Sequence, residues 1–164
     1  MNVTTQALIG RFRPDCRTFS ARPIRMHGQP TRILRHLAAM YTRQKSGRSQ
    51  VTDILLAHDW AEISVVAVPR RTAPHHDWIP GYGNCYPPSN SPGPLTGHVT
   101  DDQPWAAGEW AYLWENAHGA LHVYLSAVAR WHHLATISPD LLRRVDSTLA
   151  ADIEGRAVWL EGQR

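Results

Sequence analysis

The fold is decided by residues 105–137, which read WAAGEWAYLWENAHGALHVYLSAVARWHHLATI. This stretch holds four of the seven tryptophans and four of the ten histidines. Large apolar side chains recur in it with the i, i+3, i+4, i+7 spacing of an amphipathic helix. They are Trp110, Leu113, Trp114, Ala117, Leu121, Tyr124, Leu125, Val128, Trp131 and Ala135. The spacing predicts a helix over residues 103–135, with Asp102 as its cap and Pro104 in its first turn.

A hairpin of two strands is the alternative interpretation of the same residues. The segments 110–114 and 121–125 both alternate large apolar residues with others, and 116–119 could form the loop between them. Gly119 also disfavours a helix by about 1 kcal/mol relative to alanine. The helix is nevertheless favoured, because its apolar stripe runs through most of the stretch and the segment is rich in alanine and leucine.

Helical patterns flank this stretch on both sides. Residues 31–43 form one apolar face with Thr31 as a cap, and a second helix starts at Ser49 and extends to about residue 61. Ser138, followed by a proline and an acidic residue, is a strong helix start, and an apolar stripe continues to residue 160. The predicted fold is therefore mostly α, a bundle of two antiparallel helical hairpins, formed by 31–61 and by 103–135 with 139–160.

Two segments fall outside this pattern. Residues 62–68 are β-branched and predict either one short strand or the end of the second helix, and the strand leaves an α+β fold as the alternative class. Residues 69–102 are rich in proline and glycine and predict a long irregular loop.

The charge is divided unevenly along the chain. Residues 1–50 carry nine arginines and one lysine against one acidic residue, whereas the rest carries seven arginines and thirteen acidic residues. Residues 1–30 show no sustained periodicity, so we expect a basic, disordered arm followed by a single helical domain over 31–164. Such an arm could bind nucleic acid or another polyanion by releasing phosphate counterions. The arginines concerned are Arg11, Arg13, Arg17, Arg22 and Arg25.

Composition limits the class of protein. A chain of 164 residues is long enough for one domain with a substantial core. No apolar run approaches the 18 residues that would span a membrane, and the N-terminus lacks the apolar core of a secretory signal. The only cysteines, Cys16 and Cys85, form no disulfide framework. We therefore expect a cytoplasmic protein that does not enter membranes.

The most specific chemical pattern is Glu115-x-x-His118-x-x-x-His122. On a helix these side chains, with His133, share one flank beside the apolar stripe, so a carboxylate and two imidazoles could bind one divalent transition metal. A further ligand would come from elsewhere in the chain. The available donors are His58, His75, His76 and Asp77.

Other candidate groups are less specific. The run His75-His76-Asp77 could supply a general base with an orienting acid, and Cys85 could be a nucleophile in a loop. Glycine-rich phosphate loops and serine nucleophile motifs are absent from the sequence. The leading hypothesis is a small, non-enzymatic interaction protein with an unknown protein partner. The alternatives are a metal-binding protein or metal-dependent enzyme, and a nucleic-acid-associated protein acting through its arginines.

Overall fold

The structure is a computed structural model that describes residues 5–43, 48–66, 68–69, 76–91, 93–100, 109–115, 119–127 and 129–162. Its centre is a nine-stranded mixed sheet, and strand content (37%) exceeds helix content (34%). The prediction of a mostly α helical bundle is therefore wrong. The strands are β1 (Ala7–Phe12), β2 (Thr18–Met26), β3 (Trp60–Ile63), β4 (Asp77–Ile79), β5 (Gly83–Cys85), β6 (Leu95–His98), β7 (Trp110–Trp114), β8 (Leu121–Ala127) and β9 (Arg130–Ile137).

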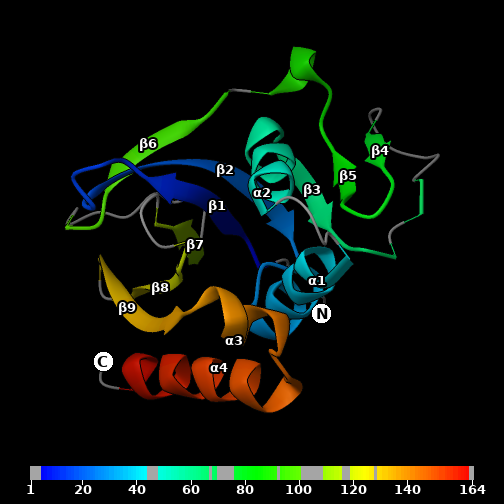
Figure 1. The fold of residues 1–164 in the computed structure, drawn as a ribbon. Coiled ribbons are helices and arrows are strands. Elements are labelled where there is room, and N and C mark those ends of the chain that lie inside the picture. Colours follow the sequence, from blue (N-terminus) through cyan, green and yellow to red (C-terminus); the bar gives the residue numbers. More distant parts are fainter. Residues whose placement is uncertain are drawn as a thin grey trace.

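The strands follow the order β4-β5-β3-β2-β1-β7-β8-β9 (Figure 1). The remaining strand, β6, pairs with the first half of β2, whereas β3 pairs with the end of β2. Two pairs are parallel, β1 with β7 and β2 with β3, and the other pairs are antiparallel. The predicted helix over 103–135 is replaced by β7, β8 and most of β9, which confirms the hairpin interpretation of 110–125. The predicted helix start at 102–104 lies outside the described residues.

Both faces of the sheet are apolar near its middle, which explains why the helical pattern misled. In β7, Trp110, Tyr112 and Trp114 join the core under the helices, while Ala111 and Leu113 join a second cluster on the other side. A strand buried on both faces reads as a nearly continuous apolar run rather than an alternating one. Such a run contains apolar residues at helical spacing by necessity, so periodicity alone could not decide between strand and helix.

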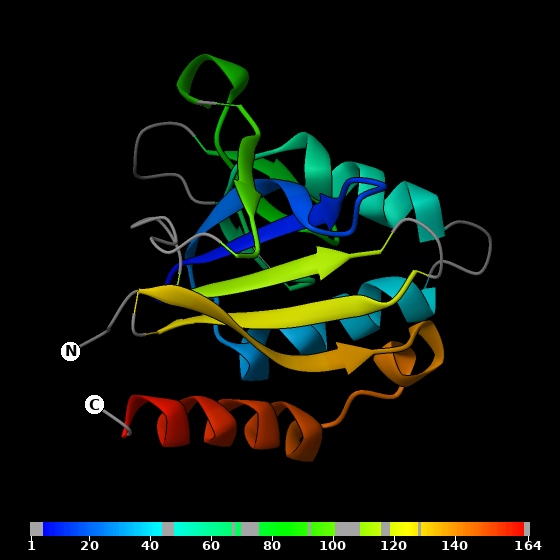
Figure 2. The ribbon, with the colours of Figure 1, turned by 90° about the vertical axis from the view of Figure 1, so that its left-hand side faces the viewer.

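The sheet is strongly curled. Phe19 on β2 and Trp131 on β9 lie four strand spacings apart, which would be about 19 Å in a flat sheet. Their ring centroids are 6.5 Å apart with the rings nearly perpendicular. The two strands therefore face each other across one side of the sheet, and Figure 2 looks onto this side. We call the side that contains Phe19 and Trp131 the opposite face. The side on which the helices pack is called the helix-covered face.

Four helices lie on the helix-covered face within the described residues: α1 (Pro30–Arg43), α2 (Arg48–Ala57), α3 (Pro139–Arg143) and α4 (Ser147–Glu161). A 3₁₀ turn, η1 (Pro88–Asn90), completes the helical elements. The prediction of a helix at 31–43 is confirmed. The second predicted helix starts near residue 49 as expected but ends at Ala57 rather than near residue 61, because residues 60–63 form β3. The predicted helix over 139–160 is two helices, each with its own cap: Ser138 accepts from the Leu141 N–H and Asp146 from the Leu149 N–H.

The start of α1 is fixed from a distance. The Thr31 N–H donates to Glu154 Oε1 of α4 at 2.8 Å, so a carboxylate from another helix satisfies a free amide at this end. Tyr112, fully buried in β7, donates its hydroxyl to the Gly28 carbonyl just before α1 at 2.7 Å. The first contact joins α1 to α4, and the second joins the start of the helical layer to the central strand β7.

The described part of the expected N-terminal arm is not an arm. Residues 7–12 and 18–26 form the adjacent strands β1 and β2 in the middle of the sheet, and Ala7, Leu8 and Ile9 are fully buried. The arginines interspersed in residues 7–26 make this apolar pattern hard to recognise in the sequence. Likewise, the expected irregular loop over 69–102 contains β4, β5, η1 and β6. Within the described residues, no helix is both long and apolar enough to cross a membrane.

Candidate functional site

A polar cluster lies on the opposite face, where β7, β8 and β9 run side by side. Leu113 of β7 pairs with His122 of β8, and His122 pairs with Thr136 of β9. Directly paired residues of antiparallel strands point to the same side, and so does every second residue along a strand. His122, Thr136 and Glu115, which follows β7 two residues after Leu113, therefore share the opposite face.

His133 reaches the same face because β9 contains a bulge. Val123 pairs with Ala135, but the next residue of β8, Tyr124, pairs with His133, so Leu134 is an extra residue. In a regular strand, residues 133 and 136 would point to opposite sides. The bulge lets Leu134 and Ala135 both pack against the helix-covered core and returns His133 to the face of Thr136.

A helix holds this bulge in place. The Arg156 Nη1 atom of α4 donates to the Leu134 carbonyl at 2.6 Å. A bulge leaves a backbone group without its ladder partner, and here a guanidinium supplies that partner. The position of the His133 side chain thus depends on a contact made on the other side of the sheet.

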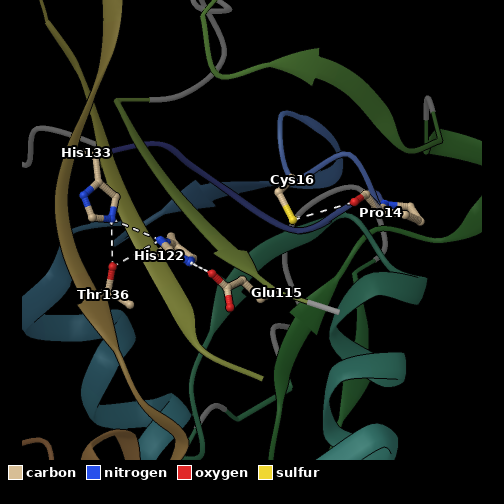
Figure 3. A network of polar contacts seen from close by, with 6 residues as sticks. All are labelled: Pro14, Cys16, Glu115, His122, His133 and Thr136. Atoms are coloured by element: carbon tan, nitrogen blue, oxygen red, sulfur yellow. Dashed lines mark hydrogen bonds and ion pairs between the residues drawn. The ribbon is translucent and has the colours of Figure 1, made fainter. Parts of the chain in front are cut away.

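The four polar side chains form a continuous chain of contacts (Figure 3). Glu115 Oε1 lies 2.6 Å from His122 Nε2, and His122 Nδ1 lies 3.1 Å from His133 Nε2. Thr136 Oγ1 lies 3.3 Å from His122 Nδ1 and 3.0 Å from His133 Nε2. The two imidazole nitrogens, His122 Nδ1 and His133 Nε2, therefore form a nearly equilateral triangle with the hydroxyl oxygen of Thr136. The Cys16 contact with the Pro14 carbonyl in the same view is separate from this chain.

Aromatic rings surround the two histidines. Phe12 lies edge-on to His122 with centroids 5.7 Å apart, and Tyr124 lies edge-on to His133 at 5.1 Å. The His122 side chain is 15% exposed, whereas His133 is open to solvent. Partial burial, with a smaller contribution from His122, lowers the pKa of His133 below its ordinary value. Burial likewise raises the pKa of Tyr124, so its phenol stays protonated near neutral pH.

The contacts restrict where protons can sit. A neutral imidazole carries one N–H, and a carboxylate only accepts. When Glu115 is ionised, His122 must donate from Nε2, which leaves Nδ1 of neutral His122 with a lone pair that can accept a hydrogen bond or bind a cation. That lone pair points at His133 Nε2 and Thr136 Oγ1. The cluster therefore contains a basic nitrogen, His122 Nδ1, and the Glu115 carboxylate fixes the orientation of this ring through its contact with Nε2.

The structure places two of the three residues predicted to bind a metal. It brings Glu115 and His122 together across the β7–β8 hairpin, whereas His118 lies outside the described residues. It adds His133, which the helical pattern had placed on the same flank, and Thr136, which no sequence signal had indicated. In the part of the chain that the structure describes, no group of three or more His, Cys, Asp or Glu side chains is arranged to hold a metal.

The predicted arginine site is dispersed. Arg22 is mostly buried under α2, where it binds the Leu56 carbonyl at 3.0 Å and Asp59 at 3.2 Å, so it has a structural role. Arg11 lies 3.7 Å from Asp53, and the remaining three are exposed. Those three are Arg13, Arg17 and Arg25. Binding of nucleic acid through these residues stays a prediction.

Two of the loop candidates lie next to each other, because Asp77 of β4 pairs with Cys85 of β5. Cys85 is buried in β5, and burial raises the pKa of its thiol, which disfavours the thiolate that a nucleophile needs. His76 packs edge-on against Tyr86 at 4.8 Å, and Asp77 is exposed on β4. His75 lies outside the described residues. His58 packs against Trp60, far along the sheet order from the cluster on β7–β9.

Comparisons of the chain with protein-family models, curated proteins and solved structures find no match.

Proposed function

We propose that the protein binds one divalent transition-metal ion on the opposite face of its sheet, with His122 Nδ1 and His133 Nε2 as ligands. The observation that carries this proposal is the triangle formed by these two nitrogens and Thr136 Oγ1, with edges of 3.1, 3.3 and 3.0 Å. Imidazole is a good ligand for zinc, copper and nickel ions.

The size of the triangle matches metal coordination. Ligands bound about 2.05 Å from a tetrahedral ion lie about 3.3 Å from one another. The observed separations are close to this value, so an ion seated over the triangle would need only small side-chain movements. The Thr136 hydroxyl is a weak ligand by itself, and the fourth position would remain open to water or to a small ligand.

The carboxylate of Glu115 supports this arrangement from behind. Metal-binding histidines commonly donate their second N–H to a carboxylate, which fixes the tautomer and strengthens the ligand. Glu115 lies 2.6 Å from His122 Nε2, on the side of the ring away from the proposed ion. The proposal thus gives Glu115 an outer role rather than the role of direct ligand that the sequence had predicted.

This function is metal binding, and no reaction is assigned to it. An open coordination position would suit either a ligand-binding role or hydrolysis. The prediction of a non-enzymatic interaction protein stays untested beside it.

Calorimetric titration of metal-free protein with Zn²⁺ near pH 7.5 tests the proposal. We expect one ion per chain, and loss of this binding in both His122→Ala and His133→Ala. His132→Ala is the matched control. Its side chain points to the other face, because His132 pairs with Leu125 of the helix-covered core. Absence of binding in the wild-type protein, or binding that survives in His122→Ala and His133→Ala, would overturn the proposal.

A further inference from the structure

A second site lies at the other end of the sheet order. A cavity of about 280 Å³ opens where the end of β2, the first turns of α1, and strands β3 and β5 meet. Its walls include side chains from all four segments. Among them are His27, Arg32, Arg35, His36, Ser64 and Asn84. Since β3 and β5 are separated from β8 and β9 by β2, β1 and β7, this cavity is distinct from the histidine cluster.

The cavity has a buried polar wall. Asn84 on β5 is 1% exposed, and its Nδ2 atom donates to the Val68 carbonyl at 3.3 Å. Its Oδ1 atom is buried and has no hydrogen-bond partner. Because the two ends of an amide are assigned from the surrounding hydrogen bonds, one end of this side chain is left over whichever way it is turned. Buried polar groups of this kind are rare in folded proteins and usually find a partner.

The rim of the cavity is positively charged. Arg32 and Arg35 are exposed on α1, and neither has an ion-pair partner in the described part of the chain. One carboxylate, that of Glu62, also lines this wall, 3.7 Å from His27. Two arginines therefore line the cavity against one carboxylate.

His36 adds a neutral donor. Burial, and next to it the charge of Arg35, lowers the pKa of His36, and the opposing effect of Glu62 is smaller than that of Arg35. The ring is therefore neutral near pH 7. Its Nδ1 atom accepts from the Val65 N–H at 3.3 Å, so the proton of the neutral ring is on Nε2.

We propose that this cavity binds a small oxyanion, a carboxylate or phosphate compound that also carries a hydroxyl or amide. Arg32 and Arg35 would bind the anionic group, since guanidinium forks match carboxylate and phosphate oxygens. The Asn84 amide would bind the neutral polar group. A cavity of about 280 Å³ has room for a small metabolite.

Melting of the full-length protein in the presence of inorganic phosphate or succinate, at ionic strength held constant with sodium chloride, tests this proposal. We expect a concentration-dependent rise in the melting temperature with at least one of the two. The double variant Arg32→Gln/Arg35→Gln should bind the same anion at least tenfold more weakly. Arg43→Gln is the matched control, because Arg43 is also exposed on α1 but does not line the cavity.

The outcomes separate clearly. A response to phosphate alone identifies a phosphate ligand, and a response to succinate alone identifies a carboxylate; either supports the proposal if the double variant has lost it. An equal response in the wild-type protein and in the double variant would show non-specific anion binding and overturn the proposal. No response of the wild-type protein to either anion would overturn it too. These arms do not depend on the histidine cluster, so the two sites are tested separately.

Discussion

The two faces of the curled sheet are built differently. The helix-covered face carries one continuous core, in which side chains of the central strands pack against four helices. The opposite face has a smaller apolar cluster, and next to it the polar chain from Glu115 to His133. Apolar burial is the main stabilising contribution to folding. Burying polar side chains instead costs free energy unless they are hydrogen-bonded. The helix-covered face thus has the larger apolar core, and the opposite face combines a smaller apolar cluster with the polar side chains of the proposed metal site.

Deleting residues 1–25 should have the largest effect. The deletion removes β1 and nearly all of β2, whose side chains contribute to both faces. We expect a chain without cooperative thermal unfolding, measured by circular dichroism. The double variant Arg13→Gln/Arg17→Gln removes charge from the same region but no strand, and it should melt like the wild-type protein. A truncated protein that melts normally would show that these strands are not part of the fold.

Leu121→Ala and Leu113→Ala compare the two apolar clusters directly. Both side chains are fully buried, Leu121 on the helix-covered face and Leu113 on the opposite face. Each substitution should lower the free energy of unfolding by about 2–5 kcal/mol in denaturant titrations. Val158→Ala, at an exposed position of α4, should change it by less than about 0.5 kcal/mol. A cost below about 1 kcal/mol for Leu113→Ala alone would mean that the opposite face has no true core.

Arg156→Leu tests whether one face positions the chemistry of the other. Loss of the hydrogen bond to the Leu134 carbonyl should loosen the bulge and displace His133. We expect Zn²⁺ affinity to fall several-fold while the far-ultraviolet spectrum stays unchanged. Arg143→Leu, which removes an exposed arginine of α3, should leave affinity as it was. Equal affinity in all three proteins would show that the bulge holds its shape without Arg156.

The smallest expected effect is on the pH dependence of stability. The pKa of His133 is lowered in the folded state, so between that value and about 6.5 the unfolded chain binds more protons than the folded one. Stability should therefore fall as the pH drops below about 6.5. His36 and His58, whose pKa values are lowered chiefly by burial, act in the same direction. Denaturant titrations at pH 7.5 and 5.5 should show a smaller loss of stability for His133→Asn than for the wild-type protein.

The sequence predicted the local elements better than their assembly. The helices α1 and α2 and the cap at Ser138 could be predicted, because their signals lie within a few neighbouring residues. The sheet could not, because residues 110–114 are buried on both sides and fit two periodicities at once. β1 was missed for a related reason. Its short apolar run stands among arginines, and only its pairing with β2 and β7 makes it a central strand.

The candidate site was predicted only in part. Glu115 and His122 were grouped on helical spacing, and the hairpin happens to bring them together by a different route. Thr136 carries no motif, and the place of His133 depends on a bulge stabilised by Arg156 of α4. A contact between residues 22 positions apart has no signature in a single sequence. The same holds for the cavity near Asn84, whose walls come from four separate segments.

The central claim is that the opposite face presents His122 Nδ1 and His133 Nε2 to one metal ion. The most direct test is NMR of the histidine side-chain nitrogens during titration of ¹⁵N-labelled protein with Zn²⁺. We expect His122 to bind the ion through Nδ1 with its proton on Nε2, and His133 to bind it through Nε2, with both rings saturating at one ion per chain. Unchanged nitrogen shifts at these two rings, or binding of His122 through Nε2 with Glu115 displaced, would contradict it.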